Sequence, residues 1–297
     1  MRKLFTIVLA LVALTPFATA QQPVDWTTPI TPFQIADNLY YVGSRDLASY
    51  LIVTPQGDIL INANLESSPP LLRASVEKLG FHWADIRILL NGQAHFDHVA
   101  GAAEVVRETH AKVETMEYDA ALMESGGRAD FAAVSDGITP YTPVHVDRVL
   151  HDGDKITLGN VTLIAHKTAG HTRGCTTFTF QVHVPGEPVG RLRNVVILGG
   201  FAPLSGYRLV NTPGHPASYP GIAADFEKTF ATLHALHCAI FLGAHGVYFD
   251  MLDKLTLLPM HGPSVWIDPD GYRKTIAAAE STFQKMLVKQ QTTAAAQ

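Results

Sequence analysis

The chain has 297 residues, of which 47% are hydrophobic and 16% are charged, and its formal net charge is −5 at pH 7. This length suits one large domain or at most two, and the composition argues against extensive disorder. A mildly acidic chain without a basic run is a poor candidate for binding nucleic acid or an anionic membrane surface, so we expect neither as a partner.

The first 20 residues have the pattern of a secretory signal peptide. A basic start at Arg2 and Lys3 precedes an apolar run from Leu4 to Leu14, and the small residues Ala18-Thr19-Ala20 follow. The apolar run is shorter than the roughly 20 residues that a membrane-spanning helix needs, although an uncleaved anchor is the alternative. We expect cleavage after Ala20 and a periplasmic protein. The removed segment holds two basic residues and no acid, so the net charge changes from −5 to −7.

Short runs of β-branched and aromatic residues predict strands over 38–42, 49–53 and 59–62. A helix is expected from Ser67-Ser68-Pro69-Pro70 to just before Gly80, because proline is common in a first helical turn and glycine at a helix end. A buried strand over 86–90 and a helix over 98–110 follow.

The second half continues the alternation of strands and helices. Strands are predicted over 149–150, 155–158, 161–165, 176–182, 194–198 and 240–242, and helices over 223–236, 251–257 and 272–289. Two such halves predict two β-sheets with helices outside them. Neither a linker nor a repeat of 20–50 residues is visible, so residues 21–290 are expected to form one domain. The low-complexity end, residues 291–297, is expected to fray.

Only two cysteines occur, Cys175 and Cys238, and neither belongs to a CxxC motif. They could pair in an oxidising compartment or remain as two buried thiols. The sequence gives no support for a cysteine-based zinc site.

Three candidate metal ligands, His95, Asp97 and His98, lie within four residues after the strand predicted over 86–90. Burying such a cluster without a cation would be costly. Two further histidines, His171 and His245, stand in glycine-flanked turns, where the backbone can approach a small centre closely. Imidazole and carboxylate are ligands that zinc prefers where one position stays open for water. The pattern therefore predicts a zinc site, whereas most of the other histidines are expected to be ordinary hydrogen-bonded side chains.

The run Gln93-Ala94-His95-Phe96-Asp97-His98, followed by His171 and His245, resembles the metallo-β-lactamase superfamily motif H-x-H-x-D-H…H…H. Glutamine replaces the first histidine of that motif. Segments 136–139, 170–177 and 226–242 are similar to the third subclass of class B β-lactamases, and the resemblance extends from about residue 26 to residue 285. It implies an α/β fold of the αββα sandwich type, with the site at the loop edge of the two sheets.

The resemblance also implies the site residues and the reaction. The first of two zinc ions would be held by Gln93, His95 and His171, and the second by Asp97, His98 and His245. A hydroxide held between them would attack the β-lactam carbonyl of penicillins, cephalosporins and carbapenems, with Asp97 orienting it. The antibiotic's carboxylate would be held by Ser205, Tyr207 or Arg208. A monomer is the family expectation.

Two alternative functions remain open. Lactonases and thioesterases of the same fold generally carry a bridging aspartate where this chain has Leu198–Ala202, which contains no carboxylate. A disabled metal-binding relative is the other alternative, because Gln93 replaces a ligand. An amide oxygen binds zinc more weakly than an imidazole, so we expect the second site to bind zinc more tightly than the first. Relatives often pair the cysteine matching Cys238 with one in the last helix, but no cysteine follows here, so Cys238 is expected to be a buried thiol.

Overall fold

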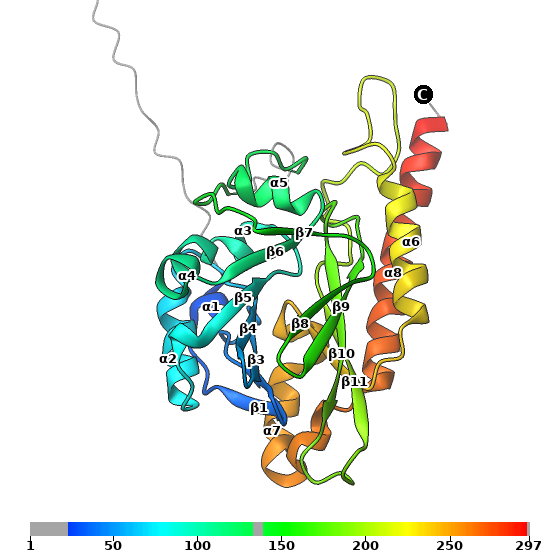
Figure 1. Ribbon diagram of the computed structural model, residues 1–297. Helices are drawn as coiled ribbons and strands as arrows, with labels where there is room; N and C mark the ends of the chain where they lie inside the picture. Colours follow the sequence, from blue (N-terminus) through cyan, green and yellow to red (C-terminus); the bar gives the residue numbers. More distant parts are fainter. Residues whose placement is uncertain (1–22, 133–138, 296–297) are drawn as a thin grey trace, which may run out of the picture.

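The computed structural model describes residues 23–132 and 139–295. The segment 1–20, predicted to be a signal peptide, and residues 136–138 lie outside the described residues. Two β-sheets lie face to face, and helices cover both outer faces (Figure 1). The predicted αββα sandwich is confirmed. Among the described residues, we find no helix with the length and apolar character needed to cross a membrane.

The first sheet contains seven strands in sequence order, antiparallel from β1 to β4 and parallel from β4 to β7. Its strands are β1 (Phe33–Ala36), β2 (Leu39–Tyr41), β3 (Tyr50–Thr54), β4 (Gly57–Ile61), β5 (Ile86–Leu90), β6 (Lys112–Met116) and β7 (Arg148–Leu150). The parallel strands bring the carboxyl ends of β4, β5 and β6 to one edge.

The second sheet contains five strands in the order β12-β11-β10-β9-β8. Its strands are β8 (Asp154–Leu158), β9 (Val161–Lys167), β10 (Thr176–His183), β11 (Leu192–Leu198) and β12 (Ile240–Gly243). Only β11 and β12 pair in parallel, and the other pairs are antiparallel.

The helices divide between the two outer faces. Helices α2 and α4 cover the first sheet, whereas α6 and α8 lie together on the second (Figure 1). The helices are α1 (Val24–Thr27), α2 (Pro69–Lys78), α3 (Phe96–Val99), α4 (Ala102–Thr109), α5 (Asp119–Glu124), α6 (Ile222–Ala235), α7 (Met251–His261) and α8 (Pro269–Ala295). Three short 3₁₀ turns complete the described elements: η1 (Trp83–Asp85), η2 (Gly246–Phe249) and η3 (Gly262–Trp266).

Two hydrophobic clusters hold the layers together. The larger one fills the space between the sheets and continues under α6 and α8, with Phe178 and Phe226 among its fully buried side chains. The smaller one packs α2 and α4 onto the first sheet through residues such as Leu72 and Val105. Apolar burial of this extent is the main driving force for folding.

The structure corrects the predicted helix over 98–110. The chain forms two helices instead, α3 and α4, with a turn at Gly101. A Cβ atom at Gly101 would lie 2.5 Å from the carbonyl oxygen of Ala63, so the glycine lets the chain pack against the loop after β4. The backbone N–H of Gly101 donates to the carbonyl oxygen of Asn64 at 3.0 Å, which fixes this contact.

The C-terminal prediction is also corrected. Residues 291–295, expected to fray, continue helix α8, and Gln290 anchors this part of the helix to the rest of the domain. The Gln290 side chain accepts a hydrogen bond from the backbone N–H of Leu209 at 2.6 Å and donates one to the carbonyl oxygen of Tyr207 at 2.7 Å. The sequence analysis considered only the composition of this segment, which does not show that Gln290 bonds to residues about 80 positions earlier in the chain.

Both cysteines are free thiols, so of the two alternatives for Cys175 and Cys238 the structure shows separate thiols and not a pair. Cys175 is fully buried and Cys238 is half-buried. Burial raises the pKa of each thiol to about 12, which keeps both protonated and unreactive at neutral pH.

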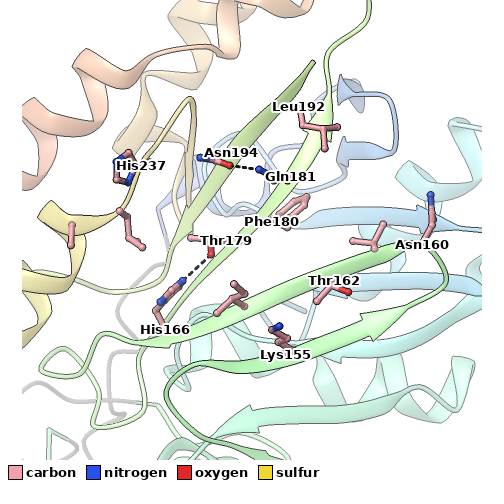
Figure 2. Close-up of a pocket in the computed structure, with 14 residues that line it drawn as sticks. Lys155, Asn160, Thr162, His166, Thr179, Phe180, Gln181, Leu192, Asn194 and His237 are labelled. Atoms are coloured by element: carbon pink, nitrogen blue, oxygen red, sulfur yellow. Dashed lines mark hydrogen bonds between the residues drawn. The ribbon is translucent and has the colours of Figure 1, made fainter. Parts of the chain in front are cut away.

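A cavity of about 590 Å³ opens on the second sheet, on strands β8 to β11 beside the end of α6 (Figure 2). Its wall mixes polar and apolar side chains, and hydrogen bonds join His166 to Thr179 and Gln181 to Asn194. None of the predicted metal ligands lines this cavity. The shape of the surface alone therefore does not locate the metal site.

A buried carboxylate in β4 makes stability depend on pH. Asp58 is 3% exposed, and burial raises the pKa of its carboxyl group to about 6, although the backbone N–H of Thr54 donates to it. The ionised form is thus disfavoured in the folded protein relative to the unfolded chain. Below about pH 4 the carboxyl group is protonated in both states and costs no stability. Between about pH 4 and pH 6 the unfolded chain loses this proton first, so the cost to the folded protein grows, and above about pH 6 it stays constant.

We expect Asp58→Asn to match the wild type in free energy of unfolding at pH 4 and to exceed it at pH 7 by up to about 3 kcal/mol, because one pKa unit corresponds to about 1.4 kcal/mol. Urea denaturation at the two pH values measures the difference. A stability difference that does not change with pH would contradict the assignment.

Candidate metal centre

The loop after β5 is held by the neighbouring strand β4. The side-chain oxygen of Asn62 accepts the backbone N–H of Gly92 at 3.0 Å, and the carbonyl oxygen of Gly92 accepts the N–H of Thr176 from β10. Asn62 has a positive φ of 67°, a conformation that asparagine tolerates better than most residues. These contacts fix the point at which the chain enters the segment from Gln93 to His98.

Three predicted second-site ligands converge although they come from two distant segments. Asp97 and His98 lie on helix α3, and His245 follows β12. The Asp97 Oδ2 atom lies 3.2 Å from His98 Nε2 and 3.5 Å from His245 Nε2. One ligand atom from each residue lies within 4.8 Å of the other two, which is close enough to share a metal ion.

The pKa values of these side chains suit metal ligands. Burial lowers the pKa of His98, so its imidazole is neutral at pH 7. Burial by itself would raise the pKa of Asp97, but His98 and His245 hold it well below its usual range. Burial also opposes a charge on His245, yet Asp46 and Asp97 raise its pKa to about 9. A metal ion that binds His245 must therefore displace a proton, so affinity falls at low pH.

Asp46 supports the second site, and the sequence analysis did not identify it. Its Oδ2 atom lies 2.8 Å from His245 Nδ1, and its two oxygens also accept the N–H groups of Trp26 and Val247. This fixes the His245 tautomer, leaving Nε2 toward Asp97. No motif signals this role, because Asp46 and His245 are 199 residues apart.

Two of the three predicted first-site ligands, His95 and His171, lie side by side. The His95 and His171 rings are 4.7 Å apart between centroids, and the Nδ1 atom of His171 lies 2.8 Å from the carbonyl oxygen of Ala202. Gln93 is 1% exposed, and its Oε1 atom has no hydrogen-bond partner within residues 23–132 and 139–295. A buried acceptor without a donor is costly, and a cation would satisfy it.

The turn after β11 is where related hydrolases carry a bridging aspartate, and its two glycines, Gly199 and Gly200, are packed too closely to carry any side chain. A Cβ atom at Gly200 would lie 2.4 Å from the ring of His171, and one at Gly199 would lie 2.2 Å from the carbonyl oxygen of Gly92. Only glycine fits at either position. The turn that lacks a carboxylate in the sequence is therefore packed directly against the first-site loops.

Asp119 joins the two loops that supply the first site, and it too was missed. Its Oδ2 atom accepts the backbone N–H of Ala94 at 2.9 Å and the hydroxyl of Thr172 at 2.7 Å. Its Oδ1 atom accepts the N–H of Gly174 at 2.8 Å. Gly174 has no room for a side chain, since a Cβ atom would lie 2.7 Å from Asp119. The carboxylate thus fixes the neighbours of Gln93, His95 and His171.

We expect Asp119→Ala to lower the free energy of unfolding of the metal-free protein by about 3 kcal/mol or more, because each buried donor left unpaired costs about 1–3 kcal/mol. Urea denaturation measures the loss. Glu227→Ala, on the exposed side of α6, is the control and should change stability by no more than about 0.5 kcal/mol. A loss below about 1 kcal/mol for Asp119→Ala would show that the three hydrogen bonds matter little.

The three residues predicted to bind substrate are placed differently from one another. Tyr207 is 1% exposed, and its hydroxyl donates to the carbonyl oxygen of His171 at 2.5 Å. The hydroxyl of Tyr207 is thus used to support the backbone at His171 and is not left for a substrate. Ser205 and Arg208 are exposed, and Arg208 Nε donates to the carbonyl oxygen of Pro216 at 2.7 Å. Their substrate contacts stay predictions.

Comparisons with known proteins agree with this geometry. A model of the metallo-beta-lactamase superfamily matches residues 45–183. FEZ-1 metallo-beta-lactamase from Legionella gormanii is 43% identical, with a TM-score of 0.85, over 91% of this chain and 100% of that one. BJP-1, a subclass B3 enzyme of Bradyrhizobium japonicum, is 34% identical, with a TM-score of 0.81, over 91% and 98%. The class B3 di-zinc enzyme LRA-12 from an Alaskan soil metagenome is 33% identical, with a TM-score of 0.81, over 91% and 98%.

The fold, the ligand cluster and these relatives define a class B metal-dependent hydrolase. The chain belongs to the metallo-beta-lactamase superfamily, and two of these solved relatives, BJP-1 and LRA-12, are enzymes of subclass B3. The predicted family resemblance is confirmed, and beta-lactam hydrolysis is the activity that it supports.

Proposed function

We propose that this protein hydrolyses penicillins, cephalosporins and carbapenems at a centre of two zinc ions. Gln93, His95 and His171 would hold the first ion, and Asp97, His98 and His245 would hold the second. The observation that carries the proposal is the convergence of Asp97, His98 and His245 within 4.8 Å.

The donor atoms suit zinc. Imidazole nitrogens and one carboxylate are ligands that zinc prefers in catalytic sites. Among the described residues, Gln93 Oε1 and the His98 ring nitrogens are buried without a hydrogen bond of good geometry, so the amide oxygen and one nitrogen of His98 are available to a cation. Zinc bound by such ligands lowers the pKa of a coordinated water to about 7 and polarises a carbonyl oxygen.

The chain's own residues position the reacting groups. Asp97 is kept ionised by His98 and His245, so it can accept a hydrogen bond from the attacking water and orient it. Asp46 fixes His245, and the hydroxyl of Tyr207 supports the segment at His171. No side chain of the protein needs to form a covalent bond with the substrate in this scheme.

Substrate binding and location complete the proposal. Ser205 and Arg208 are exposed on the loop after β11 and would hold the carboxylate of the antibiotic. The signal-peptide pattern of residues 1–20 supports export, and we propose that the protein acts in the periplasm, where it would meet antibiotics before they reach their targets. We also propose that it is a monomer, as the family resemblance implies.

Hydrolysis of a chromogenic cephalosporin and of a carbapenem by the purified protein tests the proposal. Turnover should be lost on adding a chelator and regained on adding zinc. Absence of turnover in zinc-supplemented buffer would contradict the proposal. Assays with a lactone and a thioester would then distinguish another hydrolase of this fold from a disabled metal-binding relative.

A further inference from the structure

We propose that Asp130 is a positioning residue for the first metal site, holding the Nε2 side of the His95 ring so that Nδ1 faces the metal. This inference rests on the first zinc site of the proposed function. Asp130 was not identified from the sequence, and it lies in the loop after α5, 35 residues beyond His95.

The contact is buried and close. The Oδ2 atom of Asp130 lies 3.2 Å from His95 Nε2, and the two side chains are 1% and 6% exposed. The other oxygen, Oδ1, accepts the backbone N–H of Ala132 at 2.8 Å. Neither Oδ2 nor His95 Nε2 has a hydrogen bond of good geometry among the described residues, so their approach to 3.2 Å is the polar contact that the two buried atoms share. A buried carboxylate oxygen needs a donor, and the imidazole of His95 is the group within reach.

Two other histidines of the centre, His171 and His245, show the same arrangement with the opposite nitrogen. The Nδ1 atom of His171 lies 2.8 Å from the carbonyl oxygen of Ala202, and the Nδ1 atom of His245 lies 2.8 Å from Asp46. Both rings therefore keep Nε2 for a metal. In His95 the carboxylate of Asp130 approaches Nε2 instead, so Nδ1 is the nitrogen left to coordinate.

Asp130 also places a carboxylate next to the first site, whose own predicted ligands include none. The second site has Asp97 as a ligand and Asp46 behind His245, whereas Gln93, His95 and His171 are all neutral when they coordinate. A carboxylate behind a ligating histidine raises the basicity of the imidazole. Asp130 would thereby offset part of the affinity that is lost with the amide of Gln93.

The loop of Asp130 is fixed against both first-site segments. The ring of Phe131 packs on Tyr207, with centroids 5.2 Å apart, and the hydroxyl of Tyr207 donates to the carbonyl oxygen of His171. Further along, the hydroxyl of Tyr141 donates to the carbonyl oxygen of Ala94 at 2.8 Å. These contacts place Asp130 by packing, as a positioning role requires.

Metal titration of Asp130→Asn and Asp130→Ala tests the inference. We would measure zinc affinity at each site by competition with a chromophoric chelator, and follow Co²⁺ absorption to distinguish the sites. The first-site Kd should rise about 10-fold for asparagine, which keeps an acceptor, and about 100-fold for alanine, with the second site unchanged. Asp46→Asn is the matched control and should weaken the second site instead.

Three outcomes would overturn the inference: wild-type zinc affinity in both Asp130 variants, equal weakening of both sites, or a wild-type protein that binds only one zinc ion. Circular dichroism checks folding, and the near-isosteric asparagine variant keeps the test valid if alanine prevents folding. A wild type that binds two zinc ions without opening any β-lactam would contradict the proposed function but leave this inference standing.

Discussion

Replacing Asp97 by asparagine is expected to lower kcat for a cephalosporin by a factor on the order of 10³, as for other groups that act directly on the reacting atoms. Asp97 lies 3.2 Å from His98 and 3.5 Å from His245 and is kept ionised by them. The amide is neutral, so it is a weaker ligand and a poorer acceptor for the attacking water. Steady-state kinetics with zinc content measured in parallel provides the test.

Glu227→Gln, on the exposed side of α6, is the control for the Asp97 experiment and should keep the kinetics of the wild type. A decrease in kcat with zinc content preserved would assign Asp97 to orienting the water, and a parallel loss of zinc would assign it mainly to metal binding. An Asp97→Asn variant within about tenfold of the wild-type kcat would exclude both roles.

Replacing Gln93 by histidine is expected to tighten zinc binding at the first site by at least about tenfold, which corresponds to 1.4 kcal/mol. The side chain is buried, no described residue donates a hydrogen bond to its Oε1 atom, and imidazole is a stronger zinc ligand than an amide oxygen. Zinc titration of the metal-free protein measures both sites. In the wild type, the same titration should show tighter binding at the Asp97, His98 and His245 site.

Gln181→His, at an exposed position of β10, is the matched control for Gln93→His and should leave both zinc affinities unchanged. If Gln93→His changed neither stoichiometry nor affinity, Gln93 would not be a ligand. Equal affinities at the two sites of the wild type would contradict the ranking based on ligand strength.

The sequence predicted most of the secondary structure but missed elements with weak local patterns. Strand β6 (Lys112–Met116) has only a short alternation of exposed and buried residues, and α5 (Asp119–Glu124) is too short for a clear helical period. The break between α3 and α4 at Gly101 depends on a contact with the loop after β4. A helical pattern in the sequence cannot contain that information.

The ligand-bearing loops could be predicted because their chemistry is concentrated locally. His95, Asp97 and His98 are adjacent, and a buried run of such side chains has few explanations other than a metal. The family resemblance then linked them to His171 and His245. The substrate residues were harder to assign, since the burial of Tyr207 and its hydrogen bond to His171 depend on how the loop after β11 folds back.

The sequence by itself predicted two β-sheets with helices outside them and the ligand cluster His95, Asp97 and His98, because apolar periodicity and clustered ligand types are local properties of the chain. The division of the predicted ligands into two groups came from the family resemblance. Only the tertiary structure decided which carboxylates support those ligands. Asp46, Asp119 and Asp130 are isolated in the sequence and look like ordinary surface aspartates, yet each is buried. Their roles arise because folding brings segments together and removes water, so that every buried carboxylate must find donors.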